Sequence, residues 1–200
     1  MGKRSAVVEL LLGNMGSMQR ETRPSMQREN QLTMATQLEQ IAVKARCEPN
    51  LRFTSLAHHI TRDRVLKNLL KIPKHSAAGV DGQTVEGAKE SFEGWIGPML
   101  QSIHRQGYRA PNIRRAYIPK PGKTEKRPLG VPTVSDRALQ RSAAEVLSAI
   151  YEQDFLSCSF GGRPQLSAHH ALATLNEVIA GGKISWVLEA DLKNFFGFVA

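Results

Sequence analysis

One carboxylate near the end of the chain, Asp191, follows a short apolar run and precedes two aromatic residues. The run 184–190 predicts a buried strand that ends at Asp191. Mg²⁺ prefers one or two carboxylates together with phosphate oxygens. In two-metal phosphoryl transfer, one ion activates the attacking hydroxyl and both stabilise the developing charge. A lone Asp can equally cap the turn that follows it, so its position alone leaves both interpretations open.

The aromatic pair Phe195 and Phe196 adds a second element to this pattern. A rigid ring at Phe196, five residues after Asp191, would press on the sugar of an incoming nucleotide. Such a ring leaves no room for a 2′-hydroxyl and would therefore select deoxynucleotides. The alternative is that the two phenylalanines belong to the hydrophobic core, as at least one of them is expected to do.

A basic hairpin supplies charge that is complementary to a nucleotide. Residues 114–118 predict a strand, 119–126 a loop rich in Pro and Lys, and 127–131 the returning strand. Prolines within or beside such strands indicate a sheet edge or a projecting hairpin. Lys120, Lys123, Lys126 and Arg127 would meet a triphosphate, since an Arg side chain can bind two oxygens at once. The alternative is a solvated loop, which is common for surface lysines.

The charge of the chain is concentrated in one segment. Of the net charge of +9, residues 101–141 contribute ten basic and two acidic groups, whereas 142–200 carry three and six. Such clustering favours a polyanionic partner, most commonly nucleic acid, over an evenly solvated basic face. No apolar run approaches the roughly 18 residues that span a bilayer. We expect a soluble, cytoplasmic protein without membrane contact, whose thiols, Cys47 and Cys158, are reduced and buried.

The remaining pattern predicts helices that position these groups. Helical spacing of apolar residues begins at Met34, Thr61 can cap a helix that ends before Pro73, and Thr84 one that runs to Leu100. Asp136 and Ser167 can cap two further helices, the second closed by Gly181 and Gly182. The inward residues expected on these helices are Val65, Leu66, Leu69 and Leu70; Leu139, Ala143, Val146, Leu147 and Ile150; and Leu172, Leu175, Val178 and Ile179. The fold class expected is α+β, mostly helical, with a projecting basic β-hairpin.

Four motifs stand in a specific order along the chain. They are AGVDG at 78–82, YIPKPG at 117–122 with KRPLGVP at 126–132, SFGGRP at 159–164 with SAH at 167–169, and EADLKNFF at 189–196. Each motif is short, but their shared order and spacing are specific. The sequence resembles the front half of a group II intron-encoded reverse transcriptase (maturase) over residues 50–197.

This resemblance implies the fingers and the first palm strand of a right-hand polymerase, with an incomplete palm. It implies that Asp191 is the first catalytic aspartate, that the Leu192 carbonyl is a second metal contact, and that Phe196 discriminates the sugar. Lys120 and Arg127 match the basic pair that binds the triphosphate. The residues implied to cradle template RNA are Gly79, Asp81, Gly82, Lys123, Lys126, Pro128, Leu129 and Gly130. Arg163 is expected to order the junction between fingers and palm.

The implied cofactor is Mg²⁺, and the implied partners are intron or template RNA, a DNA primer and deoxynucleoside triphosphates. The family's second metal-binding motif, an aromatic residue before a pair of aspartates, is absent from the sequence. We therefore expect an N-terminal fragment that does not polymerise alone, with a non-catalytic RNA-binding protein as the alternative. The expected divisions are a disordered extension at 1–33, an N-terminal and fingers region at 34–185, and the start of the palm at 186–200. Met1 and Met34 are both candidate starts.

Overall fold

A computed structural model of the protein describes residues 27–119, 121, 122, 124, 126–182 and 184–192. The described residues divide into two compact units, one that runs from 27 to 154 and one that runs from 155 to 192. Among the described residues, no helix combines the length and the apolar composition needed to cross a bilayer.

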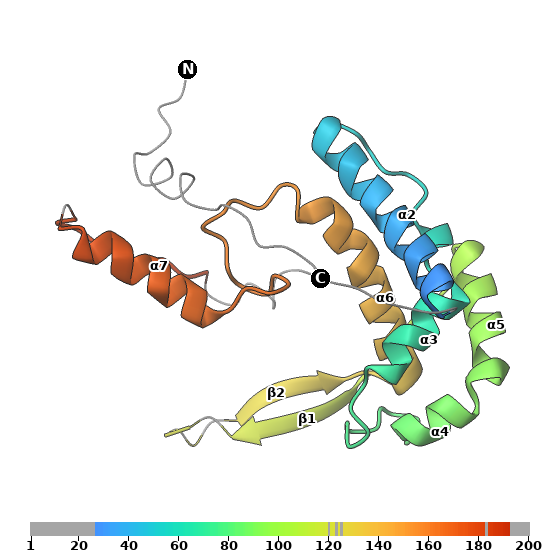
Figure 1. Cartoon of the computed structure of the whole chain (residues 1–200). Helices are drawn as coiled ribbons and strands as arrows, with labels where there is room; N and C mark the ends of the chain where they lie inside the picture. Colours follow the sequence, from blue (N-terminus) through green and yellow to red (C-terminus); the bar gives the residue numbers. More distant parts are fainter. Residues whose placement is uncertain (1–26, 120, 123, 125, 183, 193–200) are drawn as a thin grey trace. The chain divides into compact units, whose positions relative to one another are not determined.

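The first unit packs five helices and carries a two-stranded hairpin (Figure 1). The helices are α2 (Gln27–Cys47), α3 (Arg62–Leu70), α4 (Val85–Glu90), α5 (Phe92–His104) and α6 (Val134–Tyr151), with a 3-10 turn at Ala57–His59. Helix α6 packs against both α3 and α2. The hairpin consists of β1 (Arg114–Pro119) and β2 (Lys126–Val131), and it leads directly into α6.

The core of this unit forms where α3, α4, α5 and α6 meet. Its buried apolar side chains are Val65, Leu69 and Ile72; Val85 and Ala88; Phe92 and Ile96; and Val134 and Ala138. Full burial of one Val or Leu side chain contributes about 1.5–3 kcal/mol. The helical spacing in the sequence therefore identified the inward face of α3 and part of that of α6. Leu70 and Leu147 are exceptions, because they lie at the edges of their helical faces and remain exposed.

The sequence predicted the capping residues of three helices in this unit, and the structure confirms two of them. Thr61 and Thr84 accept hydrogen bonds from the backbone N–H groups of Arg64 (3.3 Å) and Gly87 (3.1 Å), as expected. At α6 the cap is Thr133, whose hydroxyl accepts from Asp136 N at 3.2 Å, so the prediction that Asp136 caps this helix is wrong. A hydroxyl three residues before an acidic residue satisfies the first-turn donors equally well.

Two helix boundaries also differ from the sequence-based expectation. Helix α2 begins at Gln27 instead of Met34, so 27–33 of the expected disordered extension is helical. The single helix expected from Thr84 to Leu100 is divided at Ser91, whose hydroxyl donates to Gly87 O at 2.7 Å. A Ser side chain that bonds a nearby carbonyl competes with the regular helical pattern. Ser91 accordingly ends α4 and precedes α5.

The second unit contains α7 (Ala168–Ala180), which begins after Ser167 and ends at Gly181 as expected. Ser167 makes no capping bond to the backbone, since its hydroxyl instead pairs with His170 Nδ1 at 3.0 Å. The predicted inward face is not buried: Leu172, Leu175 and Ile179 are all exposed. Spacing identified the helix correctly, but within its own unit nothing described covers the apolar stripe.

Two further expectations are corrected. Residues 184–192 form no strand, and Leu188 is 93% exposed, so the buried strand expected before Asp191 is wrong for the described structure. A strand is defined by its hydrogen-bonded neighbour, and the described residues offer this run none. Cys47 and Cys158 are both exposed free thiols instead of buried ones.

Candidate nucleic-acid interface

The turn at 77–82 is attached to the base of the hairpin. Arg114, the first residue of β1, donates two hydrogen bonds to the carbonyl of Ala78, from Nε at 3.0 Å and from Nη2 at 2.8 Å. Two N–H groups of one planar guanidinium converge on a single oxygen, which fixes the position of the side chain. The first motif is therefore attached to the strand that leads into the second, although nothing in the sequence indicated that Arg114 makes the link.

The same turn is held against the start of α6. A Cβ on Gly79 would lie 2.6 Å from Thr133 Cα, which is closer than any side chain is tolerated. Arg137, in the first turn of α6, donates from Nη2 to Ala77 O at 2.6 Å. Glycine at this position thus allows the backbone of the turn to touch the backbone before α6. Gly79 is buried and packs against the residue before α6, and the RNA contact implied for it stays a prediction.

The outer part of the turn is open to solvent. Asp81 accepts a hydrogen bond from Gln83 N at 3.1 Å, and Gly82 adopts a positive φ of 67°. An Asp that bonds the backbone two residues ahead forms a local turn, and the left-handed conformation of Gly82 is costly for other residues. Asp81 and Gly82 are exposed, so their backbone groups are accessible to a ligand.

The hairpin presents two chemically different faces. The strands pair antiparallel, with Arg114 opposite Val131, Tyr117 opposite Pro128 and Ile118 opposite Arg127. Because successive side chains alternate between faces, Arg127 and Leu129 share the face of Arg114. Lys126 and Pro128 share the other face with Arg115 and Tyr117.

All five residues 126–130 are exposed, and so are Arg115 and Tyr117. A Cβ on Gly130 would first meet the end of the Ile113 side chain. Because that side chain can move, a residue larger than glycine could be accommodated here. The second face therefore combines two cations with an exposed aromatic ring. Sheet surfaces that bind single-stranded nucleic acid commonly combine these two features.

A partly buried polar network supports the start of α6. Tyr108 donates its hydroxyl to Asp136 Oδ1 at 2.9 Å, and Gln140 Nε2 donates to Asp136 Oδ2 at 2.7 Å. Burial, followed by the hydrogen bond to Asp136, raises the pKa of Tyr108 well above its usual range. Tyr108 therefore remains a neutral donor and holds the carboxylate of Asp136, which is 3% exposed.

A second network joins α3 to α6. Arg64, which is 1% exposed, donates to Glu145 Oε2 at 3.2 Å, and Lys71 donates to Glu145 Oε1 at 3.2 Å. Partial burial raises the pKa of Glu145, but Lys67 and the hydrogen bonds from Lys71 and Asn68 outweigh it, so the net pKa is lowered. Glu145 is therefore held as a carboxylate. Sequence reasoning missed this network because a buried Arg gives no periodic signal.

The predicted metal ligand Asp191 lies in the exposed run 184–192, next to the exposed Leu192. Within the described part of the chain, no group of three or more His, Cys, Asp or Glu residues is arranged to hold a metal ion. The described residues thus supply single ligands and do not by themselves fit a complete magnesium site. Lys120, Lys123 and Phe196 lie outside the described residues.

Arg163 orders the loop that precedes α7, while the role expected of it at the junction of fingers and palm stays a prediction. Nη1 donates to the carbonyls of Leu156 and Ser159, both at 2.9 Å, and the guanidinium lies 5.2 Å from the centre of the Phe155 ring. These contacts close the loop that precedes α7. They lie within the second unit and say nothing about its junction with the first.

Comparison with known proteins agrees with the motifs. The chain is 33% identical over 168 residues to the group II intron-encoded protein LtrA of Lactococcus lactis subsp. cremoris, a match that covers 82% of this chain and 27% of that protein. It is also 33% identical to protein YkfC of Escherichia coli (strain K12), covering 80% of this chain and 43% of that protein. An uncharacterised 91 kDa protein in the cob intron of Schizosaccharomyces pombe is 34% identical over 101 residues, half of this chain. No family model matches the chain.

The chain belongs to the family of group II intron-encoded proteins, and the resemblance stated from the motifs is confirmed. It spans less than half the length of these first two curated relatives.

Proposed function

We propose that the chain forms the fingers and first palm segment of an RNA-directed DNA polymerase of the group II intron type. Its described structure would supply the surface that binds intron or template RNA. The observation that carries this proposal is the pair of hydrogen bonds from Arg114 to Ala78 O, which attaches the turn of the first motif to the basic hairpin that contains the second.

The two faces of the hairpin suit different parts of the substrate. Arg127 would bind the phosphates of a deoxynucleoside triphosphate, since a guanidinium binds two phosphate oxygens at once. Lys120, on the loop beyond β1, would share this role. On the opposite face, Lys126 and Arg115 would bind the RNA backbone while Tyr117 stacks on a base.

The turn contributes backbone groups to the same surface. Asp81 and Gly82 are exposed while Gly79 fixes the turn against α6, so the turn is positioned to line the template with little freedom. Pro128, Leu129 and Gly130 continue this surface along β2. An exposed, rigid edge of this kind favours contact with a strand over contact with a small ligand.

Asp191 is proposed as the first catalytic carboxylate, with the Leu192 carbonyl beside it, and Phe196 as the residue that excludes ribonucleotides. Asp191 and the Leu192 carbonyl would supply part of the ligand set for Mg²⁺, the ion that would serve phosphoryl transfer of this kind. Two-metal transfer needs carboxylates from more than one segment, so we propose that these 200 residues bind RNA without extending a primer. Mg²⁺-dependent primer extension by the purified chain, lost in Asp191→Ala, would contradict that part of the proposal.

Crosslinking tests the binding surface directly. Single-stranded RNA that contains 4-thiouridine would be irradiated with the purified chain, and the crosslinked peptides identified by mass spectrometry. We expect crosslinks in 76–82 and in the hairpin, with Tyr117 as the principal acceptor. Crosslinks confined to α2 or α5 would show that RNA binds elsewhere and would contradict the assignment.

A further inference from the structure

A hollow of about 390 Å³ lies beside the turn, between the end of α3 and the outer side of α6. Ile72 and Pro73, which follow α3, form one wall together with Ser76. Arg137, Gln140 and Arg141 of α6 form the other. None of the described residues that line it is acidic, and neither the hairpin nor Asp191 contributes to it.

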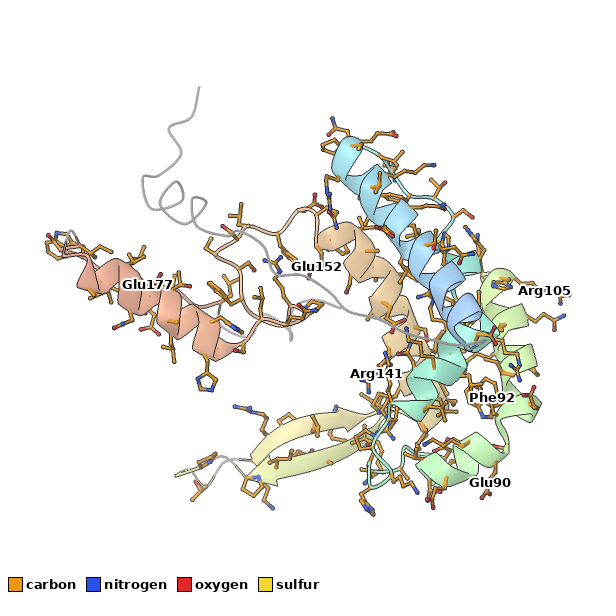
Figure 2. All side chains as sticks on the ribbon, in the orientation of Figure 1. Glu90, Phe92, Arg105, Arg141, Glu152 and Glu177 are labelled. Carbon is orange, nitrogen blue, oxygen red and sulfur yellow. The ribbon has the colours of Figure 1, made fainter. Side chains whose placement is uncertain are left out.

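Two guanidinium groups enter this hollow from one helix. Arg137 and Arg141 are four residues apart, so they are neighbours on the same face of α6. Arg137 is fixed by its bond to Ala77 O, and its Nε is buried without a hydrogen-bond partner in the described structure. Arg141 is exposed, and Figure 2 shows its side chain projecting from α6. One cation is thus held in place, and the other is available to a ligand.

The acidic residues of α6, Asp136 and Glu145, are already engaged. Asp136 is held by Tyr108 and Gln140, and Glu145 by Arg64 and Lys71. Since both carboxylates have partners of their own, the positive charge of Arg141 is not neutralised by them. A solvent-accessible site with an uncompensated guanidinium pair favours an anion that accepts several hydrogen bonds.

The residues that line the hollow indicate which class of anion it would bind. Ile72 and Pro73 add apolar surface to the lining that holds the two cations, and Ser76 and Gln140 add polar groups to it. Such a site suits a phosphate ester that carries an organic group, better than a bare ion. The Arg137 bond also ties this hollow to the turn whose next carbonyl, that of Ala78, is bound by Arg114. A strand lying along the turn would pass both places.

We propose that this hollow binds one phosphodiester of a bound RNA strand. Arg141 would contact its oxygens, Arg137 would present a fixed guanidinium, and the sugar would rest on Pro73. The proposal rests on RNA binding as the proposed function and adds a second anchor outside the hairpin. It also gives Arg137 two tasks, because the residue that holds the turn would also orient the strand.

The test uses Arg141→Gln in the full 200-residue chain, with Arg105→Gln as the matched control. Arg105 is an exposed arginine that follows α5 and takes no part in the hollow (Figure 2). Affinity for a labelled single-stranded RNA would be measured by fluorescence anisotropy across a salt series. Loss of one phosphate contact lowers the slope of log affinity against log salt by about 0.7 and the affinity near 0.1 M salt by about five-fold.

We expect this change for Arg141→Gln and almost none for Arg105→Gln. Equal behaviour of the two variants, with wild-type RNA binding intact, would overturn the inference while leaving the proposed function standing. Failure of the wild-type chain to bind RNA would overturn both. Arg141 is exposed and is expected to be replaceable without unfolding, which circular dichroism would verify.

A second experiment distinguishes an RNA phosphate from the phosphates of a free nucleotide. Deoxyadenosine triphosphate would be titrated against wild type and Arg141→Gln without RNA, at matched ionic strength. We expect no difference between the two proteins in this arm. If Arg141→Gln weakens binding of the triphosphate but leaves RNA affinity unchanged, the hollow takes a nucleotide and the RNA assignment is wrong.

Discussion

The guanidinium of Arg114 binds the carbonyl of Ala78 through two hydrogen bonds, at 3.0 and 2.8 Å, across 36 residues of sequence. This contact fixes the base of a projecting hairpin to a turn that is packed against α6. The hairpin has no other strand to pair with in the described structure, and a lone hairpin is marginally stable in water. Its orientation therefore depends on the few contacts at its base.

Replacing Arg114 with Gln removes both bonds, and we expect RNA affinity to fall because the turn and the hairpin no longer form one surface. Hydrogen bonds that involve a charged group contribute about 1.5–3 kcal/mol when well formed, and less at an exposed site. A modest loss of stability, about 1 kcal/mol in urea unfolding, is expected along with the weaker binding.

Arg115→Gln is the control for the stability measurement, since Arg115 lies next in the strand on the opposite face. It removes the same charge but leaves the turn attached. If Arg115→Gln destabilises the chain as much as Arg114→Gln does, the bond to Ala78 has no structural role.

Gly79→Ala places a methyl group 2.6 Å from Thr133 Cα and 2.7 Å from Thr133 N. Both neighbours are backbone atoms, so the turn must move away from α6. Overpacking of this kind costs about 1–3 kcal/mol. We expect a lower urea midpoint with an unchanged m-value.

Gly94→Ala provides the comparison, because a Cβ at Gly94 in α5 meets nothing within 4 Å. Alanine favours a helix over glycine by up to about 1 kcal/mol, so this variant is expected to be as stable as wild type or more stable. Equal stability of Gly79→Ala and wild type would show that the turn is not packed on α6 as described.

Glu145 should make the chain sensitive to acid. Its net pKa is lowered from 4.5, because Lys67, Lys71 and Asn68 outweigh the opposing effect of burial. A lowered pKa in the folded state means that the stabilisation is complete above the unfolded pKa and is lost as pH falls through the folded value. Stability should therefore decline below a pH of about 4.5, by no more than about 1 kcal/mol from this partly exposed group.

The measurement is urea unfolding at neutral pH and at successively lower pH. Glu145→Gln should be less stable than wild type at neutral pH, since it leaves the buried Arg64 without its carboxylate partner, and its stability should fall less on acidification. Glu90→Gln, an exposed carboxylate at the end of α4, should retain the wild-type pH dependence. If the stability of Glu145→Gln falls on acidification as much as that of wild type, Glu145 does not cause the acid sensitivity.

The sequence predicted the parts of the fold that depend on local pattern. The hairpin follows from its strand propensity and its prolines, the caps at Thr61 and Thr84 from their hydroxyls, and α3 from the spacing of Val65 and Leu69. Each of these features is encoded within a few residues. The division of the helix at Ser91 is local too, but it depends on the hydrogen bond that the serine hydroxyl donates to the carbonyl of Gly87.

Contacts between distant segments escaped prediction for a physical reason. Arg114 and Arg137 each bind a carbonyl of the turn at 77–78, and any backbone carbonyl is an acceptor, so no residue type marks the partner. At the exposed face of α7 and in the unpaired run before Asp191, the sequence instead predicted contacts that the described structure does not contain. There, an apolar pattern predicted burial that the described part of the second unit does not supply.

The central claim is that the hairpin and the adjoining turn bind RNA, and its most direct test is the double variant Arg115→Gln with Lys126→Gln, which removes both cations from the proposed RNA face. Anisotropy with single-stranded RNA across a salt series would be compared with a control that carries Arg52→Gln and Arg105→Gln, two exposed positions away from the hairpin. We predict that the hairpin variant loses at least about ten-fold in affinity and about 1.4 in salt slope, as expected for two phosphate contacts. Equal losses in both double variants would mean that RNA senses only net charge, which would contradict a binding surface on the hairpin.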